Sequence, residues 1–387
     1  MEIKEVNLAE NKDFFEVALR IYKNDPNWVA PLEVEIKSLF DKNKNKLLQN
    51  GDFKAWVLYK NNIPVGRIIA FWTEKKSKKR SPYEGGLSFF ECINNQEAAN
   101  LLFGTAIEWL KTQEMQVVDA ITVPGENYNY WGVLVEGFVR QGFGMPYNPP
   151  YYKELFEDYG FQNYYEQYSY HVDLTKEFPE RHVKFAQHIL NSTEYDFKYL
   201  DINNPEKFAK DITTIFNDVW SVFHADYVPV EYHEFLKILE ELKPIIKPKY
   251  VWLAYHNNYP VGMAICLPDL NQAIKPFKGK LNLFNKIRLI FRLKKINRAR
   301  LFVTGVNPKY QRTGLIYGIF LKLTDSLKED KIKELEMSWV GNYNPKVNQL
   351  YKHMGNTIKA KTHVTFRYII DKNIEFKRFE NLKEHES

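Results

Sequence analysis

This chain has few cysteines and no long apolar run. It holds 2 cysteines in 387 residues, Cys92 and Cys266, which are too few for a disulfide framework or a cysteine-based metal cluster. Its first residues, 1–5, lack the features of a secretory signal peptide, and no apolar stretch reaches the length that crosses a bilayer. We therefore expect a reduced, soluble, cytoplasmic protein without a metal.

The chain also has only a small excess of positive over negative charge. The net charge is +6 and the isoelectric point is about 8.8, which mildly favours anionic ligands such as phosphates but is too weak to indicate nucleic acid. Hydrophobic residues make up 44% and aromatic residues 16% of the sequence, which argues against disorder. A chain of this length suits two domains of about 150–200 residues, each with its own core.

One segment occurs twice at an offset of 196 residues, as Trp56-x-x-Tyr59-x-Asn61-Asn62-x-Pro64-Val65-Gly66 and as Trp252-x-x-Tyr255-x-Asn257-Asn258-x-Pro260-Val261-Gly262. A period of half the chain indicates two copies of one domain. Asparagine tolerates positive φ, so an Asn-Asn pair between apolar runs predicts a β-hairpin. The predicted strands are 54–59 with 65–72, and 250–255 with 261–267.

The surrounding patterns also match between the halves. Each half reads as β, α, ββ hairpin, β, α, β, α, β, and it ends on a strand over 163–173 or 357–370. This order predicts an α/β fold with a mixed sheet flanked by helices. We expect a first domain at 1–178, a linking helix at 179–192, a second domain at 193–372 and a polar tail at 373–387.

A short helix is predicted before the last strand of each half. An Asn cap followed by Pro in the first helical turn is indicated by Asn148-Pro149-Pro150 in the first half and by Asn344-Pro345 in the second. The ends of the two helices are indicated by Gly160 and Gly355.

The second half then carries a more specific pattern, Val303-Thr304-Gly305-Val306-Asn307-Pro308-Lys309-Tyr310-Gln311-Arg312-Thr313-Gly314-Leu315-Ile316. It resembles the GNAT-type N-acetyltransferases, in which a strand ends in Val-x-Pro-x-Tyr and Gln/Arg-x-x-Gly-x-Gly/Ala opens a long helix. Ile316 departs from the third anchor, and its side chain could crowd the cofactor. The resemblance extends over nearly the whole chain and implies two tandem GNAT-like domains.

The resemblance also implies that the second half binds acetyl-coenzyme A or another acyl-coenzyme A. The residues it assigns to the cofactor are Val303, Thr304, Gly305, Val306, Gln311, Arg312, Thr313, Gly314, Leu315, Ile316 and Asn344. A glycine turn at a helix N-terminus points N–H groups at a pyrophosphate, and the helix dipole adds attraction. The alternative is that Gly314 is only a turn glycine before a helix.

The first half lacks this pattern. Its corresponding segment, 89–100, contains no glycine and has acidic residues at Glu91 and Glu97, where a phosphate would lie. Like charge there should repel coenzyme A. We interpret the first half as a degenerate copy that is structural or shapes the substrate site.

For acyl transfer, the resemblance implies Tyr351 as the acid that protonates the leaving thiolate; Phe156 takes its place in the first copy. Glu336 is the candidate base, with Ser338 on the same strand face. Each has a structural alternative: Tyr351 as a core aromatic, Glu336 as a hydrated strand-edge carboxylate and Asn344 as a helix cap. The acceptor site would be lined by Trp220 and His224.

The segment 271–300 contains ten basic residues and no acidic one. Apolar residues recur in it at helical spacing: Leu283, Phe284, Ile287, Ile290 and Phe291. A basic amphipathic helix can lie on an anionic membrane or a nucleic acid, or serve as a lid. The alternative is a surface helix whose apolar stripe docks on its own domain.

These patterns lead to one hypothesis with two alternatives. We expect an N-acyltransferase that moves an acetyl or longer acyl group from coenzyme A to the amine of a small molecule, with the site in the second half. The alternatives are a catalytically silent ligand-binding or scaffold protein of the same fold, and a transferase that uses aminoacyl-tRNA.

Overall fold

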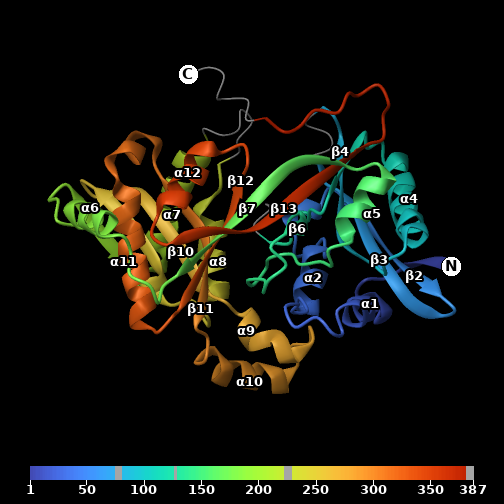
Figure 1. Ribbon diagram of the computed structural model, residues 1–387, viewed down its shortest axis with the longest axis horizontal. Coiled ribbons are helices and arrows are strands. Elements are labelled where there is room, and N and C mark those ends of the chain that lie inside the picture. The colour runs from blue at the N-terminus through green and yellow to red at the C-terminus, as the bar shows by residue number, and fades with distance from the viewer. Residues whose placement is uncertain (75–80, 126–128, 222–228, 381–387) are drawn as a thin grey trace. The chain divides into compact units, whose positions relative to one another are not determined.

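The computed structural model describes the chain except for residues 75–80, 126–128, 222–228 and 381–387 (Figure 1). The chain forms two compact units. Unit 1 comprises Met1–Tyr168, Ala273–Phe291 and Lys361–Phe379, and unit 2 comprises Ser169–Gln272, Arg292–Ala360 and Glu380–Ser387. No helix among the described residues is both long and apolar enough to cross a membrane.

Unit 1 is built on a mixed sheet with the strand order β1-β2-β3-β4-β5-β13, and β6 also pairs with β13. Its strands are β1 (Glu2–Val6), β2 (Asp52–Lys60), β3 (Ile63–Trp72), β4 (Glu84–Cys92), β5 (Val117–Ala120) and β6 (Val133–Glu136). Its helices are α1 (Asp13–Ile21), α2 (Glu33–Leu39), α4 (Gln96–Thr112) and α5 (Tyr152–Tyr159). The β4–β5 pair is parallel.

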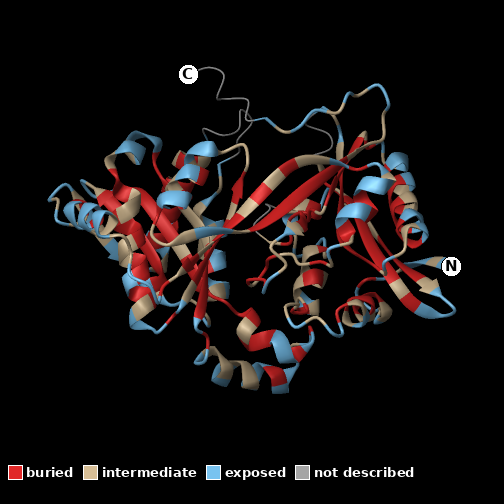
Figure 2. Ribbon diagram, viewed as in Figure 1, coloured by how far each residue is buried: buried red, intermediate tan, exposed pale blue. Residues whose placement is uncertain are grey.

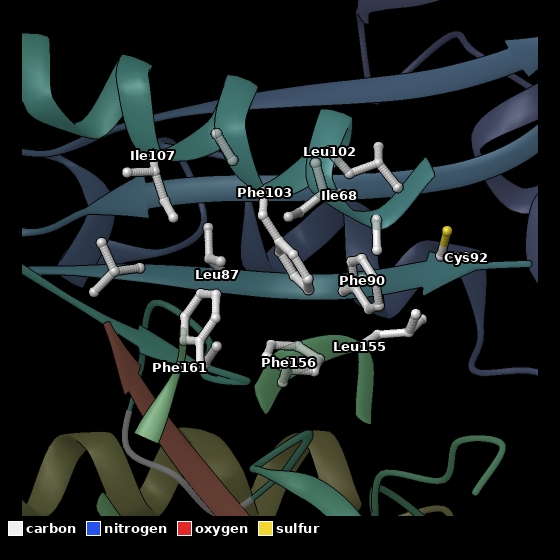
Figure 3. Packing of buried hydrophobic residues seen from close by; sticks show 14 of the residues in the cluster. Ile68, Leu87, Phe90, Cys92, Leu102, Phe103, Ile107, Leu155, Phe156 and Phe161 are labelled. Carbon is white, nitrogen blue, oxygen red and sulfur yellow. The ribbon is translucent and has the colours of Figure 1, made fainter. Parts of the chain in front are cut away.

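Successive side chains along the strands of unit 1 point to opposite faces of the sheet and form two hydrophobic cores. Trp56 and Leu58 join a cluster beneath α4 and α5, while Ala55 and Val57 join a cluster beneath α1 and α2. Figure 3 shows the first cluster, in which Phe103 of α4 lies over Phe90 of β4. The strands are largely buried and the outer side of α4 is exposed, as Figure 2 shows.

Two long strands, β7 (Gln162–Asp173) and β13 (Thr357–Ile369), have residues in both units. In unit 1, β13 pairs with β5 from Phe366↔Ala120 to Ile369↔Val117. The buried Arg367 guanidinium donates to Asp119 Oδ1 at 2.6 Å and to Glu84 Oε1 at 2.7 Å. A strand from the end of the sequence is therefore built into the sheet of the first half.

Unit 2 has the strand order β7-β12-β11-β10-β9-β8. Its other strands are β8 (Tyr195–Tyr199), β9 (Val251–His256), β10 (Tyr259–Pro268), β11 (Arg298–Val306) and β12 (Glu334–Gly341). Its helices are α6 (Glu180–Leu190), α7 (Pro205–Trp220), α8 (Tyr232–Leu242), α11 (Leu315–Glu329) and α12 (Pro345–His353). Between β10 and β11 lie α9 (Asn271–Ile274) and α10 (Leu283–Leu293).

Helices cover both faces of this sheet too. α7 and α8 share one cluster with Val251, Leu253 and Met263. α11 packs over β9 and β10, and a Cβ added to Gly262 would lie 2.8 Å from Ile319 of α11. α6 packs in turn on α11. The predicted linking helix is thus a component of unit 2.

The predicted fold class is confirmed, and so are the two hairpins. Asn61 and Asn62 have φ of 52° and 61°, and Asn257 and Asn258 have φ of 49° and 63°, the left-handed values that the turn requires. The compact units differ from the predicted domain boundaries because they divide within β7 and again within β13.

The prediction of Asn148 as a helix cap is wrong. α5 begins after Tyr151, which makes no side-chain capping bond. Asn148 instead accepts from the Leu134 N–H at 2.6 Å and donates to the Leu134 carbonyl at 3.0 Å, on β6. The two prolines that follow place the asparagine too far ahead of the helix to cap it.

Candidate functional site

In unit 2 a parallel strand pair separates along its length. β11 and β12 are in register from Arg298↔Glu334 to Leu301↔Met337, yet β11 continues to Val306 and remains paired with β10. The register between β10 and β11 shifts between Ile265 and Cys266, where β11 leaves β12. A bulge adds twist and bends a strand, which accounts for the separation.

The turn after β11 leads into α11 through a glycine, which has no side chain to cap the helix. Gly314 has φ of +81° and serves as the N-cap of the helix, whose first turn holds no acidic residue. The preceding 3-10 turn, Pro308–Thr313, carries the exposed Lys309 and Arg312. A helix N-terminus with these surroundings attracts anions.

The equivalent position in unit 1 differs, and only one of its two predicted acidic residues lies at the helix end. There α4 follows β4 and leads to the parallel strand β5, but the Asn95 side chain accepts from the Ala98 N–H at 2.8 Å and caps the helix. Glu97 lies in its first turn. Glu91, by contrast, lies on β4 and is buried, with its carboxylate 3.4 Å from Arg67. An anion would therefore meet an occupied, acidic helix end in unit 1.

Two side chains lie close to the Gly314 turn. The ring of Phe185, from α6, occupies the place where a Cβ on residue 314 would point, so a side chain there would overlap it. Ile316 is half-buried on the first turn of α11. These apolar groups narrow the space beside the helix end, whereas Lys309 and Arg312 lie on the exposed part of the turn.

Several predicted cofactor residues lie together at the end of β11. Val303, Thr304 and Gly305 are half-buried and pair with β10. The Gln311 side chain donates to the Val306 carbonyl at 3.2 Å and links the turn to the strand. The other members of the turn are Thr313, which accepts from the Leu315 N–H at 3.3 Å, and the buried Leu315.

Trp220 is brought to the same place. A Cβ added to Gly305 would lie 3.3 Å from its ring, and the ring stacks on Phe216 with centroids 4.3 Å apart. The other predicted acceptor residue, His224, lies outside the described residues.

Glu336 is buried in an ion pair. It is 1% exposed, and its Oε2 accepts from the Arg298 guanidinium. Burial opposes the charge of Arg298, but the carboxylates of Glu336, Asp269 and Glu334 outweigh it and raise the arginine pKa. The alternative of a hydrated, strand-edge Glu336 is therefore wrong. Its surroundings favour a structural role over the base role, because a carboxylate held by a guanidinium is a weak base.

Ser338 and Asn344 have structural partners as well. Ser338 Oγ accepts from Arg300 Nε at 2.8 Å, and Arg300 is itself buried with its guanidinium 4.0 Å from the Phe302 ring centroid. Asn344 accepts from the Val347 N–H at 3.2 Å, which confirms the predicted cap of α12. Arg298 and Arg300 were not among the site residues predicted from the sequence. The pattern that could have indicated their burial is that residues 298 and 300, on one face of β11, lie opposite residues 334 and 336 of β12.

Tyr351 is a buried phenol on α12, with the ring of Tyr170 edge-on beside it. None of the hydrogen bonds among the described residues involves its hydroxyl. Burial, and then the neighbouring Tyr170, raise its pKa well above the ordinary value for tyrosine. The group stays protonated and can donate a hydrogen bond, but it is too weak an acid to transfer its proton fully to a thiolate.

These features fit an anionic, elongated ligand. Gly314 has no side chain to cap the α11 N-terminus, where Thr313 accepts from the Leu315 N–H, and the separation of β11 from β12 leaves backbone groups that are not paired between them. The residues present could hold a pyrophosphate at the helix end and an extended arm along β11, which is the shape of coenzyme A.

The second half of the chain is similar to a known protein family. Residues 210–355 match the model of the Acetyltransferase (GNAT) family. The chain is 27% identical over 365 residues to Protein YghO of Escherichia coli (strain K12), with 90% of each chain covered. It is 26% identical over 361 residues to Bacterial ceramide synthase of Caulobacter vibrioides (strain NA1000 / CB15N), with 90% of this chain and 92% of the relative covered.

Among solved structures, a tandem GNAT protein from the clavulanic acid biosynthesis pathway superposes with a TM-score of 0.57 at 10% identity, with 95% of this chain and 98% of that chain covered. This likeness shows the fold. The match to the Acetyltransferase (GNAT) family model covers residues 210–355, so the family is indicated for the second half, while the likeness over the whole chain is one of fold.

Proposed function

We propose that this protein transfers an acyl group from an acyl-coenzyme A to an amine, and that the second half carries the reaction. The contrast between the two helix ends carries the proposal. Gly314 at the start of α11 has no capping side chain of its own and no acid follows in the first turn, although Thr313 accepts from the Leu315 N–H, whereas Asn95 and Glu97 occupy the start of α4. Both α4 and α11 follow a strand that pairs in parallel with the strand after the helix. The two halves therefore differ at the helix end that would bind an anion, not in the strands before it.

In the proposed reaction the amine nitrogen attacks the thioester carbonyl carbon. A C–N bond forms, the C–S bond breaks, the nitrogen loses one proton and the thiolate gains one. The buried Tyr351 hydroxyl would donate a hydrogen bond to the departing sulfur, since its raised pKa keeps it protonated. We assign no side-chain base, because Glu336 is held by Arg298.

For the substrates, we propose a long acyl chain and a lipid amine. The relative from Caulobacter vibrioides is named a ceramide synthase and covers nearly the whole chain. A ceramide is the N-acyl derivative of a long-chain amino alcohol, so the same chemistry here would join a fatty acyl group to such an amine. Mass spectrometry of products from palmitoyl- or acetyl-coenzyme A, with sphinganine or a short amine, tests this choice. Preferred acetylation of the short amine would refute it.

Calorimetric titration with coenzyme A tests the site itself. Ile316→Glu places a carboxylate at the α11 N-terminus, where it should favour the helix but repel a pyrophosphate. We expect it to weaken binding by about tenfold or more, while the neutral Ile316→Gln binds like the parent. Absence of binding by the parent chain, or equal affinity of all three proteins, would count against the proposal and favour a silent member of the fold.

A further inference from the structure

The strongest unexplained surface is the outer side of α10. Five large apolar side chains of this helix are exposed: Leu283 at 75%, Phe284 at 67%, Ile287 at 51%, Ile290 at 63% and Phe291 at 66%. At the ~100° per residue of an α-helix they fall within an arc of about 120°. The alternative that this apolar stripe docks on its own domain is therefore wrong.

The opposite side of the helix holds it to unit 1. Leu289 packs on a cluster formed by Val29, Leu32, Ile274 and Phe277. Asn285 is buried, and its side chain donates to the Lys280 carbonyl at 2.8 Å. The apolar stripe thus faces outward because the other face of α10 is already packed.

The turn that precedes α10 is also tightly built. The Glu33 N–H donates to the Gly279 carbonyl at 2.9 Å, and the Lys275 ammonium donates to the Pro26 carbonyl. Gly279 has φ of +82°, and a Cβ there would lie 2.9 Å from the Pro31 carbonyl oxygen. The backbone of this connection approaches the Pro31 backbone too closely for a side chain at residue 279. The orientation of α10 is therefore set by specific contacts.

Basic residues frame the stripe. By helical position Lys286 lies at one edge of the apolar arc and Arg288 at the other, and Lys294 and Lys295 follow the helix as exposed residues. Of the ten basic residues of the segment 271–300, Arg298 and Arg300 are buried in β11, and the other eight lie in the connection before β11, which contains no acidic residue. Apolar residues flanked by cations match an anionic lipid surface.

We propose that α10 docks this protein on anionic membranes, with its axis in the plane of the lipid headgroups. The helix has 11 residues, about 16 Å, so it is too short to span a bilayer and suited to lie on one. A nucleic acid would use the cations but leave the five apolar side chains exposed to water, and so it fits this surface less well. The proposal stands on α10 alone and does not depend on the proposed reaction.

Sedimentation of the full chain with vesicles tests the proposal without any substrate. We expect binding to vesicles of phosphatidylcholine with phosphatidylglycerol and little binding to phosphatidylcholine alone. Combined Phe284→Ser and Phe291→Ser should reduce partitioning by about tenfold or more, because two large apolar side chains no longer enter the lipid. Replacing Lys286, Lys294 and Lys295 by Gln should weaken binding and reduce its dependence on salt.

The control removes exposed apolar side chains elsewhere, by Ile238→Ser and Ile358→Ser, which are 46% and 61% exposed. It should bind like the parent chain. The proposal is overturned if the parent does not bind anionic vesicles, or if the phenylalanine variant binds as well as the parent. It is equally overturned if the phenylalanines instead support self-association seen by analytical ultracentrifugation, or if only RNA is bound and only the lysine variant loses it.

Discussion

The ring of Tyr170 stands edge-on to that of Tyr351, with centroids 5.5 Å apart and planes at 85°. The two phenol hydroxyls differ in their hydrogen bonding. Tyr170 donates to Asn348 Oδ1 at 2.7 Å, while the Tyr351 hydroxyl has no partner among the described residues. One hydroxyl is thus used for structure, and the other is available to a ligand.

This difference predicts opposite effects of the same substitution. Tyr351→Phe removes no hydrogen bond within the described chain, so its melting temperature should stay near that of the parent. Its kcat should fall by about tenfold to a hundredfold if the hydroxyl stabilises the leaving thiolate. Tyr170→Phe should instead cost about 1–2 kcal/mol of unfolding free energy and leave kcat nearly unchanged. Undiminished turnover of Tyr351→Phe would remove this residue from the mechanism.

Glu336 should matter mainly for stability. Glu336→Gln removes one partner of a buried ion pair and should cost about 3 kcal/mol in denaturant unfolding, whereas Glu334→Gln, at a half-buried site, should cost less. Joint replacement by Arg298→Met and Glu336→Leu should be less destabilising than the sum of the single changes. The pH profile of kcat/KM should be the same in Glu336→Gln as in the parent; loss of its acidic limb would restore the base role.

Gly314 should be required for stability for two reasons that can be measured separately. Gly314→Ala places a Cβ at φ of +81°, which costs about 1–2 kcal/mol, and also drives it into the ring of Phe185. Removing the ring by Phe185→Ala relieves only the second cost. In a double-mutant cycle measured by denaturant unfolding, the double variant should therefore be more stable than the sum of the single effects implies. Strict additivity would show that the ring moves freely aside.

Glu35 should make unit 1 sensitive to pH. Burial raises the pKa of its carboxyl from 4.5 to about 7, although Tyr130 donates to it at 2.8 Å. Because the folded state holds this proton more tightly than the unfolded one, stability falls as the pH rises from about 4.5 to 7. Glu35→Gln should therefore raise the melting temperature at pH 8 by about 2–4 °C and change it little at pH 4, since both states are then protonated. The exposed Glu10→Gln is the control, with no change expected at either pH.

Local features were predictable where the backbone conformation restricts which residue type can occupy a position. Asn61 and Asn62, like Asn257 and Asn258, tolerate the positive φ of a tight hairpin, and each pair lies at the predicted turn. Gly314 takes a left-handed conformation at the predicted helix start. These properties belong to single residues and their neighbours in sequence, so a pattern suffices to reveal them.

Other predictions failed because they depend on distant partners. Arg298 and Arg300 belong to a basic run, yet both are buried because their guanidinium groups donate to Glu336 and Ser338 of β12. The apolar stripe of α10 resembles a docked helix but faces outward, since Leu289 and its neighbours already hold the other face.

By itself, the sequence determined that the chain is duplicated, which turns close its hairpins, and which half lost the glycine at its helix start. Only the tertiary structure decided that β13 enters the sheet of unit 1, where Arg367 meets Asp119, and that α6 lies over Gly314. Turn preference acts within a few residues, whereas strand pairing and burial depend on which remote segments meet. No pattern in one half specifies which strand completes its sheet.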